Sequence, residues 1–351
     1  MKNVLIVDDS FFVRRVLGDI IDDFLHFTVV DSVQNGKLAL KALEQYDVDV
    51  ITLDLEMPEM DGIETLEALE ERDIDIPVIV ISSHTEDNAQ FGAKALEYGV
   101  VQMIEKPQAD GGGTPKIELL KEDLHEILQA LFDDEPDSHK TTEVSDDRSE
   151  ILSNREEFEP KMVVVGGSTG APAHLRTLLR GLPEDFPLPI VVVQHITEPF
   201  LSGLADNLDQ NTDLTVRQAT KTTVLEGGHV YMPGEEKHII LRPNGENHAV
   251  RTDGEDPVNS ACPSVDVLFE TAADVAHGDV IAVLFTGMGE DGAQGMKKLH
   301  DEGALCLAQN RETSTVYGMP AKAKKLGAVD YSFSPAELPK ILTQVAEGIK
   351  T

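Results

Sequence analysis

The chain has 351 residues, two cysteines and a formal net charge of −35 at pH 7, from 64 acidic and 29 basic residues. The length allows two domains with separate cores, and the charge excludes binding to nucleic acid or to an anionic membrane surface by the chain as a whole. Two cysteines provide no disulfide framework, and no apolar run approaches the roughly 18 residues of a membrane-spanning helix. We therefore expect a cytoplasmic globular protein without direct membrane insertion.

The excess of acidic residues also points to a particular solvent. At molar salt the screening length falls to about 3 Å, so a strongly acidic surface repels itself much less. We interpret the composition as that of a salt-adapted protein, and we expect its source to be a halophilic archaeon. We expect no signal peptide, because a short apolar stretch leads directly to the acidic pair Asp8 and Asp9.

Residues 1–110 repeat a pattern of strand and helix. Five apolar runs alternate with helix-like segments, at residues 4–7, 28–30, 48–53, 78–81 and 100–104. Strands built almost entirely of Val, Ile and Leu are typical of a parallel sheet that is covered on both faces. We therefore predict a doubly wound α/β domain over 1–110, with its ligand crevice at the carboxyl ends of the strands.

An acidic linker is predicted over residues 111–159. It opens with three glycines at 111–113, and acidic residues outnumber basic ones along it. Within it, residues 117–132 place apolar side chains at the spacing of an amphipathic helix, which we expect to close the first domain. The remaining stretch, 133–159, is expected to be flexible and solvated.

A second α/β domain is predicted over residues 160–351. Strand-like runs recur at 162–165, 190–193, 281–285 and 305–308. Short β-like pieces at 230–232 and 238–241, separated by glycine and proline, predict an antiparallel hairpin set into or beside the sheet. The predicted fold is therefore two doubly wound parallel-sheet domains joined by the acidic linker.

Polar side chains of the first domain gather at the strand ends. Asp8 and Asp9 follow the first strand and Asp54 ends the third, so three carboxylates are expected in one crevice. Carboxylates this close repel one another unless a hard cation neutralises them, and Mg²⁺ fits this chemistry. Ser82 ends the fourth strand, and Lys106 follows the fifth, where it can face a phosphoryl group. In so acidic a chain an Asp-Asp pair can also be a solvent-exposed surface pair. The position of all these polar residues at strand ends favours a binding site instead.

The first domain resembles the receiver domains of bacterial and archaeal response regulators. The resemblance rests on VLIVDDS at 4–10, DLEMPEMDG at 54–62 and EKP at 105–107. It implies a flavodoxin-like fold, phosphorylation by a histidine kinase, and Mg²⁺ as the cofactor. The residue roles that it implies are phospho-acceptor for Asp54, Mg²⁺ acids for Asp8 and Asp9, phosphoryl contact for Ser82 and counter-ion for Lys106. Met103 departs from the family, which usually has an aromatic switch residue there.

A G-x-S-x-G motif centred on Ser168 follows the first strand of the second domain. Its glycines permit a tight strand-to-helix turn that exposes the hydroxyl, and backbone N–H groups at the helix start can stabilise an oxyanion. A dinucleotide-binding loop would need G-x-G-x-x-G and an acid after the next strand, but that strand ends in Gln194 and His195. His195 can serve as a base beside Ser168, and Asp291, in a glycine-rich turn after a later strand, can orient it. A lone histidine or a loop aspartate is more often structural, so the pattern depends on all three together.

These segments make the second domain similar to the catalytic domain of the chemotaxis protein-glutamate methylesterases, and the domain order matches that family over the whole chain. PSVDVLF at 263–269, QNRETS at 309–314 and YGMP at 317–320 agree as well. The resemblance implies Ser168 as nucleophile, His195 as general base and acid, Asp291 as orienting acid, and the backbone N–H groups near Thr169 and Met288 as the oxyanion hole. It also implies methylated chemoreceptors as substrates, with deamidation of receptor glutamines as a further activity. The remaining histidines show no metal-ligand spacing, so we expect no metal or cofactor for the esterase. Ala171 and Cys262 stand where the family commonly has a glycine and a basic residue.

Two other classes of function are weighed against the esterase. A phosphorylation-controlled adaptor would bind receptors or kinase without hydrolysis, and it would be expected to lack the nucleophile, the base or the acid, all of which are present. A transcriptional response regulator would need a basic DNA-binding module, which the acidic α/β second half does not provide.

Overall fold

The computed structural model describes residues 1–83, 91–92, 94–106, 113–132, 158–197, 200–245 and 247–348. The chain divides into two units, Met1–Asp133 and Asp134–Thr351. Most of the predicted solvated connection at 133–159 lies outside the described residues. In the part of the chain that is described, no helix is both long enough and apolar enough to span a membrane.

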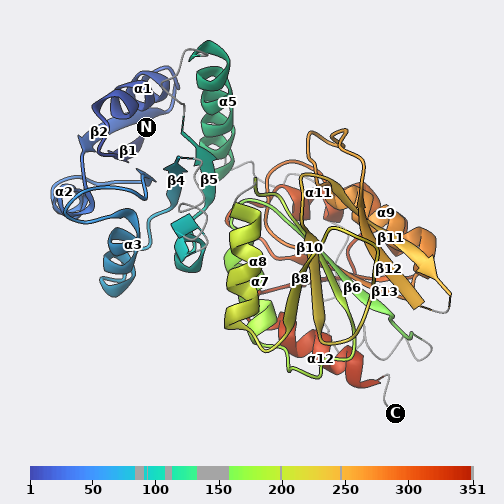
Figure 1. Ribbon diagram of the computed structural model, residues 1–351. Helices are drawn as coiled ribbons and strands as arrows, with labels where there is room; N and C mark the ends of the chain where they lie inside the picture. The colour runs from blue at the N-terminus through green and yellow to red at the C-terminus, as the bar shows by residue number, and fades with distance from the viewer. Residues whose placement is uncertain are drawn as a thin grey trace. The chain divides into compact units, whose positions relative to one another are not determined.

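The first unit is built on a five-stranded parallel sheet, as predicted (Figure 1). The order is that of a flavodoxin-like fold, and the chain order reverses between β1 and β3. The strands in their order across the sheet are β2 (Phe27–Val33), β1 (Lys2–Val7), β3 (Val50–Leu53), β4 (Val78–Ser82) and β5 (Gln102–Glu105). Two predicted strands begin two residues later than the apolar runs at 48–53 and 100–104, because strand ends are poorly marked in sequence.

Helices α1 (Phe11–Asp22) and α5 (Gly113–Phe132) contribute to one hydrophobic core on this sheet. The hydroxyl of Ser10 caps α1 by accepting the N–H of Val13, and apolar residues at helical spacing on α1 meet Leu124 and Leu128 of α5. The predicted amphipathic helix at 117–132 is thus the greater part of α5. Among the described residues, the first unit also contains α2 (Gly36–Leu43), α3 (Gly62–Glu71) and the short 3₁₀ helix η1 (Leu96–Tyr98).

The second unit is built on a seven-stranded sheet in which all strands are parallel. The chain starts at β6, fills one side of the sheet and then returns to fill the other, so the chain order reverses beside β6. The strands in their order across the sheet are β15 (Tyr331–Phe333), β14 (Leu305–Gln309), β13 (Val280–Leu284), β6 (Met162–Gly167), β7 (Ile190–Gln194), β10 (His229–Pro233) and β8 (Thr215–Ala219).

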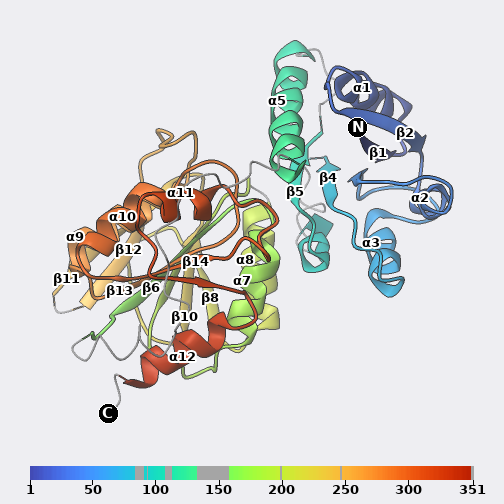
Figure 2. The same ribbon diagram turned by 180° about the vertical axis from the view of Figure 1, so that it is seen from behind.

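Two groups of helices cover this sheet (Figures 1 and 2). Neighbouring helices α9 (Val265–Ala276), α10 (Ala293–Asp301) and α11 (Met319–Lys325) form one group. The other group contains α7 (Ala171–Arg180), α8 (Phe200–Asn211) and α12 (Leu338–Gly348), with α7 contacting both of its neighbours. The doubly wound α/β fold predicted for this half of the chain is therefore confirmed.

The predicted antiparallel hairpin is also present, but it is made of different pieces. Strands β11 (His238–Asn244) and β12 (Asn247–Asp253) form it, and β9 (Thr223–Val224) adds a third strand. The run at 230–232 is not part of this sheet, because β10 pairs in parallel with β7 and β8 in the main sheet. All three residues of that run are buried, as is usual for an internal strand of a parallel sheet.

Candidate active site and acidic crevice

The first unit brings its predicted acidic residues together. Asp8 and Asp9 follow β1, Asp54 follows the neighbouring β3, and carboxylate oxygens of all three lie within 4.8 Å of one another. Lys106 follows β5, and its Nζ lies 2.8 Å from Asp8 Oδ2 and 2.6 Å from Asp54 Oδ2. Ser82 is fully buried at the end of β4, the strand between β3 and β5.

Burial dominates the electrostatics of this crevice. Burial raises the pKa of Asp54 to about 6 even though Lys106 acts in the opposite direction, and it raises the pKa of Asp8 against the same lysine. Burial also lowers the pKa of Lys106, but the charges of Asp54 and Asp8 outweigh it and leave that pKa raised. One ammonium group therefore does not fully compensate the two buried carboxylates.

Two hydroxyl groups on the strands that lead to this crevice are buried without a hydrogen-bond partner, namely Ser82 Oγ at the end of β4 and Thr52 Oγ1 in β3. Buried polar atoms are rarely left unpaired, and carboxylates with unmet charge are suitable ligands for a hard divalent cation. The residues present therefore fit Mg²⁺ together with a phosphoryl group. Met103 lies buried in β5 opposite Val80.

In the second unit, Ser168 lies in the tight turn between β6 and α7. Gly170 caps α7 with a φ of 79°, in the left-handed region that favours glycine. A Cβ at Gly170 would also lie 2.3 Å from Thr315 Oγ1. The Ser168 N–H donates to Thr286 O at 3.1 Å, and the Ser168 carbonyl accepts from Gln194 Nε2 at 2.8 Å. The backbone of the turn is therefore held from two neighbouring strand ends.

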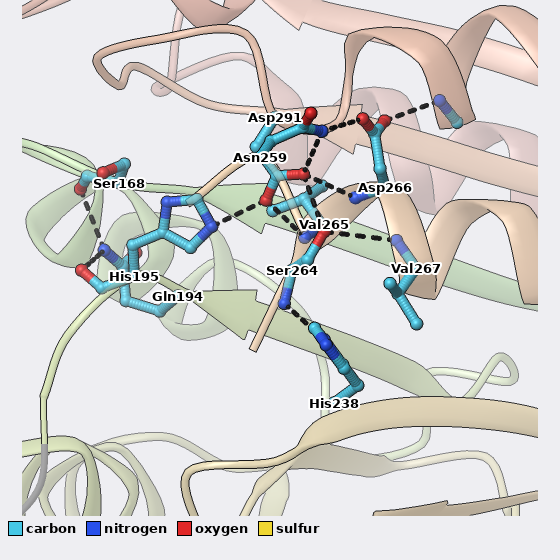
Figure 3. Close-up of polar contacts among 11 residues, drawn as sticks. Ser168, Gln194, His195, His238, Asn259, Ser264, Val265, Asp266, Val267 and Asp291 are labelled. Atoms are coloured by element: carbon cyan, nitrogen blue, oxygen red, sulfur yellow. Dashed lines mark hydrogen bonds and ion pairs between the residues drawn. The ribbon is translucent and has the colours of Figure 1, made fainter. Parts of the chain in front are cut away.

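His195 and Asp291 meet at the same edge of the sheet. His195 follows β7, and Asp291 lies in the loop after β13; these strands flank β6 on its two sides. His195 Nε2 lies 2.8 Å from Asp291 Oδ2, and in the view of Figure 3 the imidazole ring lies between Ser168 and Asp291. Because Nε2 faces the carboxylate, Nδ1 is the nitrogen left for the Ser168 hydroxyl. No hydrogen bond joins Ser168 to the ring, and such contacts often form only when substrate is bound.

Asp291 is surrounded by hydrogen-bond donors. Its carboxylate accepts Ser264 Oγ–H at 2.8 Å and the backbone N–H groups of Val265 at 2.7 Å and Asp266 at 3.0 Å. Burial raises the pKa of Asp291, but His195 and these backbone donors outweigh it, so the pKa lies below its ordinary value. The carboxylate is therefore held ionised and aimed at the histidine.

The two predicted oxyanion-hole residues lie in the Ser168 turn and in the loop after β13. Thr169 is buried directly after Ser168, and its carbonyl accepts the Thr286 hydroxyl at 3.1 Å. The loop that contains Met288 passes close to the nucleophile, because a Cβ on Gly287 would lie only 2.7 Å from the Ser168 Cβ. The structure thus brings the five predicted positions of the second domain to one edge of the sheet.

Sequence reasoning missed several polar residues that support this site. Gln194 also donates from Nε2 to His195 O at 3.4 Å, so one buried amide links the two turns that hold Ser168 and His195. Thr286 is fully buried, and its N–H donates to Gln309 Oε1 at 2.8 Å. The available signal was a polar residue at the end of an otherwise apolar strand, as in VVVQ at 191–194 and LAQ at 307–309.

Each unit matches a known protein family. Residues 163–342 match the family model described as CheB methylesterase, and residues 4–114 match the response regulator receiver domain. A protein-glutamate methylesterase/protein-glutamine glutaminase of Geobacillus kaustophilus is 36% identical over 334 residues, covering 93% of this chain and 93% of that protein. One from Thermotoga maritima is 35% identical and covers 97% of this chain and 98% of its own length.

A solved structure is similar to the second unit. The crystal structure of the Thermotoga maritima CheB methylesterase catalytic domain aligns with a TM-score of 0.52 at 35% identity. The alignment covers 53% of this chain and 98% of that one. Together with the family models and the full-length relatives, this shows that the chain belongs to the CheB methylesterase family, with a response regulator receiver domain ahead of the methylesterase domain.

Proposed function

We propose that the chain hydrolyses glutamate methyl esters on chemoreceptors, that it also deamidates receptor glutamines, and that it thereby serves adaptation in chemotaxis. Its full-length relatives are named protein-glutamate methylesterase/protein-glutamine glutaminase. The observation that carries the proposal is the contact of 2.8 Å between His195 Nε2 and a buried Asp291, at the strand ends that flank Ser168.

The chemistry follows the acyl-transfer pattern of a serine, a histidine and an aspartate. Ser168 Oγ attacks the ester carbonyl while His195 Nδ1 takes the hydroxyl proton, and the anionic Asp291 stabilises the imidazolium. The backbone N–H groups of Thr169 and Met288 receive the oxyanion. The imidazolium returns the proton to the leaving methoxide, and methanol departs. Water, deprotonated by His195, then cleaves the acyl-enzyme, releasing a glutamate carboxylate and the free serine.

The first unit controls this reaction through phosphorylation of Asp54 by a histidine kinase. Asp8, Asp9 and Asp54 would hold Mg²⁺, which when bound supplies positive charge beside the phosphoryl oxygens. Lys106 provides a second cation within 2.6 Å of the acceptor carboxylate. Ser82 supplies a hydroxyl that has no other hydrogen-bond partner. Phosphorylation is proposed to raise the rate of ester hydrolysis by the second unit.

The decisive test is methanol release from a methylated receptor fragment, measured in molar salt for the wild type and for Ser168→Ala. Each protein is assayed with and without Mg²⁺ and acetyl phosphate as the phosphodonor. We expect release that needs Ser168 and that rises with the phosphodonor. An absence of release from a wild-type protein that still becomes phosphorylated on Asp54 would favour a non-hydrolytic adaptor.

Two further aspects of the protein are proposed with this function. The net charge of −35 supports adaptation to a cytoplasm with molar salt, as in a halophilic archaeon. Unfolding curves should then show a midpoint that is lower in dilute buffer than in molar KCl, and equal midpoints would contradict the proposal. We also propose domain limits at 1–110 and 160–351, with 111–159 connecting them and with α5 of this connection packed on the core of the first domain.

A further inference from the structure

A tight turn places one amide side chain against two buried carboxylates of the second unit. Asn259 Nδ2 donates to Asp266 Oδ2 at 2.6 Å and to Asp291 Oδ1 at 3.3 Å (Figure 3). Both carboxylates are only 3% exposed, whereas Asn259 itself lies at the protein surface. A single surface side chain therefore links the acid that contacts His195 to a second buried acid.

The backbone of this turn determines where the amide points. Val258 and Ala261 exchange two backbone hydrogen bonds of 3.0 Å, and the two residues between them are both left-handed, with φ of 51° at Asn259 and 62° at Ser260. Asparagine is among the few residues other than glycine that adopt this conformation readily. The left-handed turn is by itself a reason for an asparagine at 259. A test must therefore distinguish the effect of the backbone conformation from the effect of the side-chain hydrogen bonds.

Two ionised carboxylates this close are costly without donors between them. Asp266 Oδ1 accepts the Gly295 N–H at 2.6 Å, and its Oδ2 accepts the Asn259 amide. Burial and the charge of Asp291 raise the pKa of Asp266 to about 6 in spite of these two donors. Because the amide presents N–H to both acids, its orientation matches the state in which both acids are ionised.

Other charged groups face this pair from the elements around it. Glu270, one turn along α9, adds negative charge near Asp266. Lys298 of α10 is engaged with Asp274 Oδ1 at 2.5 Å and with the Glu270 carbonyl at 3.3 Å. His195 faces Asp291 directly. The two carboxylates therefore lie in one low-dielectric cluster beside the imidazole, and the charge of each affects the proton affinity of the other.

We propose that Asn259 is a positioning residue for hydrolysis: its amide bridges Asp266 and Asp291, keeps both ionised, and so keeps Asp291 available to orient His195. The inference rests on the proposed esterase function. If the amide is removed, the negative charge of the cluster loses two N–H donors. The affinity of the two carboxylates for a proton then rises. A protonated Asp291 no longer stabilises the imidazolium that forms when His195 takes the Ser168 proton.

The test compares four variants of the full-length protein. Asn259→Gly keeps the left-handed turn and removes the amide, while Ser260→Gly relaxes the same turn and keeps the amide. Asn259→Asp replaces the bridging donor with a third carboxylate. Asp266→Asn removes one charge from the other end of the bridge. Melting temperatures by circular dichroism show which variants are folded.

Two readouts are followed between pH 5 and pH 9. One is the rate at which a fluorophosphonate probe labels Ser168, and the other is methanol release from a methylated receptor fragment. For Asn259→Gly we expect kcat/KM near neutral pH to fall roughly tenfold, the rate equivalent of a charge-assisted hydrogen bond. We expect the acid limb of the pH–activity profile, where activity falls as the pH is lowered, to move to higher pH by on the order of half a unit to one unit. Activity should recover at alkaline pH. Asn259→Asp should lose more, Ser260→Gly should match the wild type, and Asp266→Asn should move the limb to lower pH.

Each outcome decides the matter. No loss in Asn259→Gly would show that residue 259 only forms the turn. A loss that is the same at every pH would show that the amide does not act by keeping the two acids ionised, and either result would overturn the proposal. If Asn259→Gly does not fold, Asp266→Asn alone carries the test, and an unmoved acid limb overturns the inference. If the probe labels Ser168 but no variant or wild type releases methanol, the proposed substrate is wrong. The labelling profiles then still decide the role of Asn259.

Discussion

The two units place buried aspartates at equivalent positions, at strand ends where the chain order of a parallel sheet reverses, yet they treat these acids in opposite ways. Asp54 of the first unit accepts one backbone N–H, from Glu56 at 3.3 Å, and faces Lys106. Asp291 of the second unit accepts two backbone N–H groups and two side-chain donors, besides its contact with His195. The pKa of Asp54 is raised to about 6, whereas that of Asp291 is lowered.

The difference teaches that burial alone does not decide the charge state of an acid. Burial is the largest influence on both carboxylates and raises both pKa values. What differs is the supply of donors, which come from a helix start and a turn around Asp291 but are few around Asp54. The first crevice is therefore suited to an incoming cation, and the second already contains the partners that keep its acid ionised.

The largest expected effect comes from Asp291→Asn. An asparagine would leave His195 without an anionic partner, and by analogy with other triads kcat should fall by about 10³- to 10⁴-fold. The folded protein should also lose stability at neutral pH. Because the pKa of Asp291 is lowered on folding, its stabilisation is present above the unfolded pKa and is lost as the pH falls through the folded pKa.

Methanol release and thermal unfolding at pH 8 and pH 4 would measure both effects, with the exposed Asp253→Asn as the matched control. A destabilisation equal at both pH values would contradict the assigned role of the charge. So would a variant with wild-type kcat.

Asp54→Asn should change the stability in the opposite direction to Asp291→Asn, and it should abolish regulation. Phosphodonor stimulation should disappear completely, because the acceptor carboxylate is gone, while the basal hydrolysis remains. In buffer with EDTA the melting temperature at pH 8 should rise by a few degrees, since a carboxylate whose pKa is raised on folding opposes folding when ionised. Calorimetry of the wild type and both Asp→Asn variants tests whether the two melting temperatures change in opposite directions. A fall in melting temperature for Asp54→Asn would refute this expectation.

Removing Mg²⁺ should have a smaller effect, confined to the first unit. A cation that binds only the folded state at 100 times its dissociation constant adds about 2.7 kcal/mol to the free energy of unfolding. Mg²⁺ should therefore raise the melting temperature of the wild type and of Asp291→Asn equally, and raise that of Asp54→Asn less. Titration with MgCl₂ against a KCl control of equal ionic strength measures this; an equal shift in all three proteins would exclude binding at Asp54.

The smallest expected effect concerns the boundary between the units. Limited proteolysis of the folded chain should cut within 133–159 and leave both units with their original melting transitions. Helix α5 should remain with the first fragment, because its residues Leu120, Leu124 and Leu128 are buried in that core. Mass spectrometry of the fragments locates the cuts, and cleavage inside 117–132 would place the boundary elsewhere.

Much of the fold could be predicted because its signals are local. Apolar strands such as MVVV at 162–165 and VIVI at 78–81 are long enough to indicate a parallel sheet by themselves. The run at 230–232 was misplaced for a physical reason: three apolar residues do not distinguish an internal parallel strand from a hairpin strand. Only pairing with β7 and β8 decides that.

The candidate site also combines features that the sequence predicts with features that only the tertiary structure decides. The sequence by itself determined which residue types stand at the strand ends, because Asp54, Ser168, His195 and Asp291 each follow a recognisable strand or glycine turn. The tertiary structure alone decided that His195 faces Asp291 through Nε2, and that Asn259 and Ser264 donate to the same carboxylate. These donors lie 32 and 27 residues from Asp291 along the chain. No local pattern records such contacts, since they depend on how the loops before α9 and α10 meet in space.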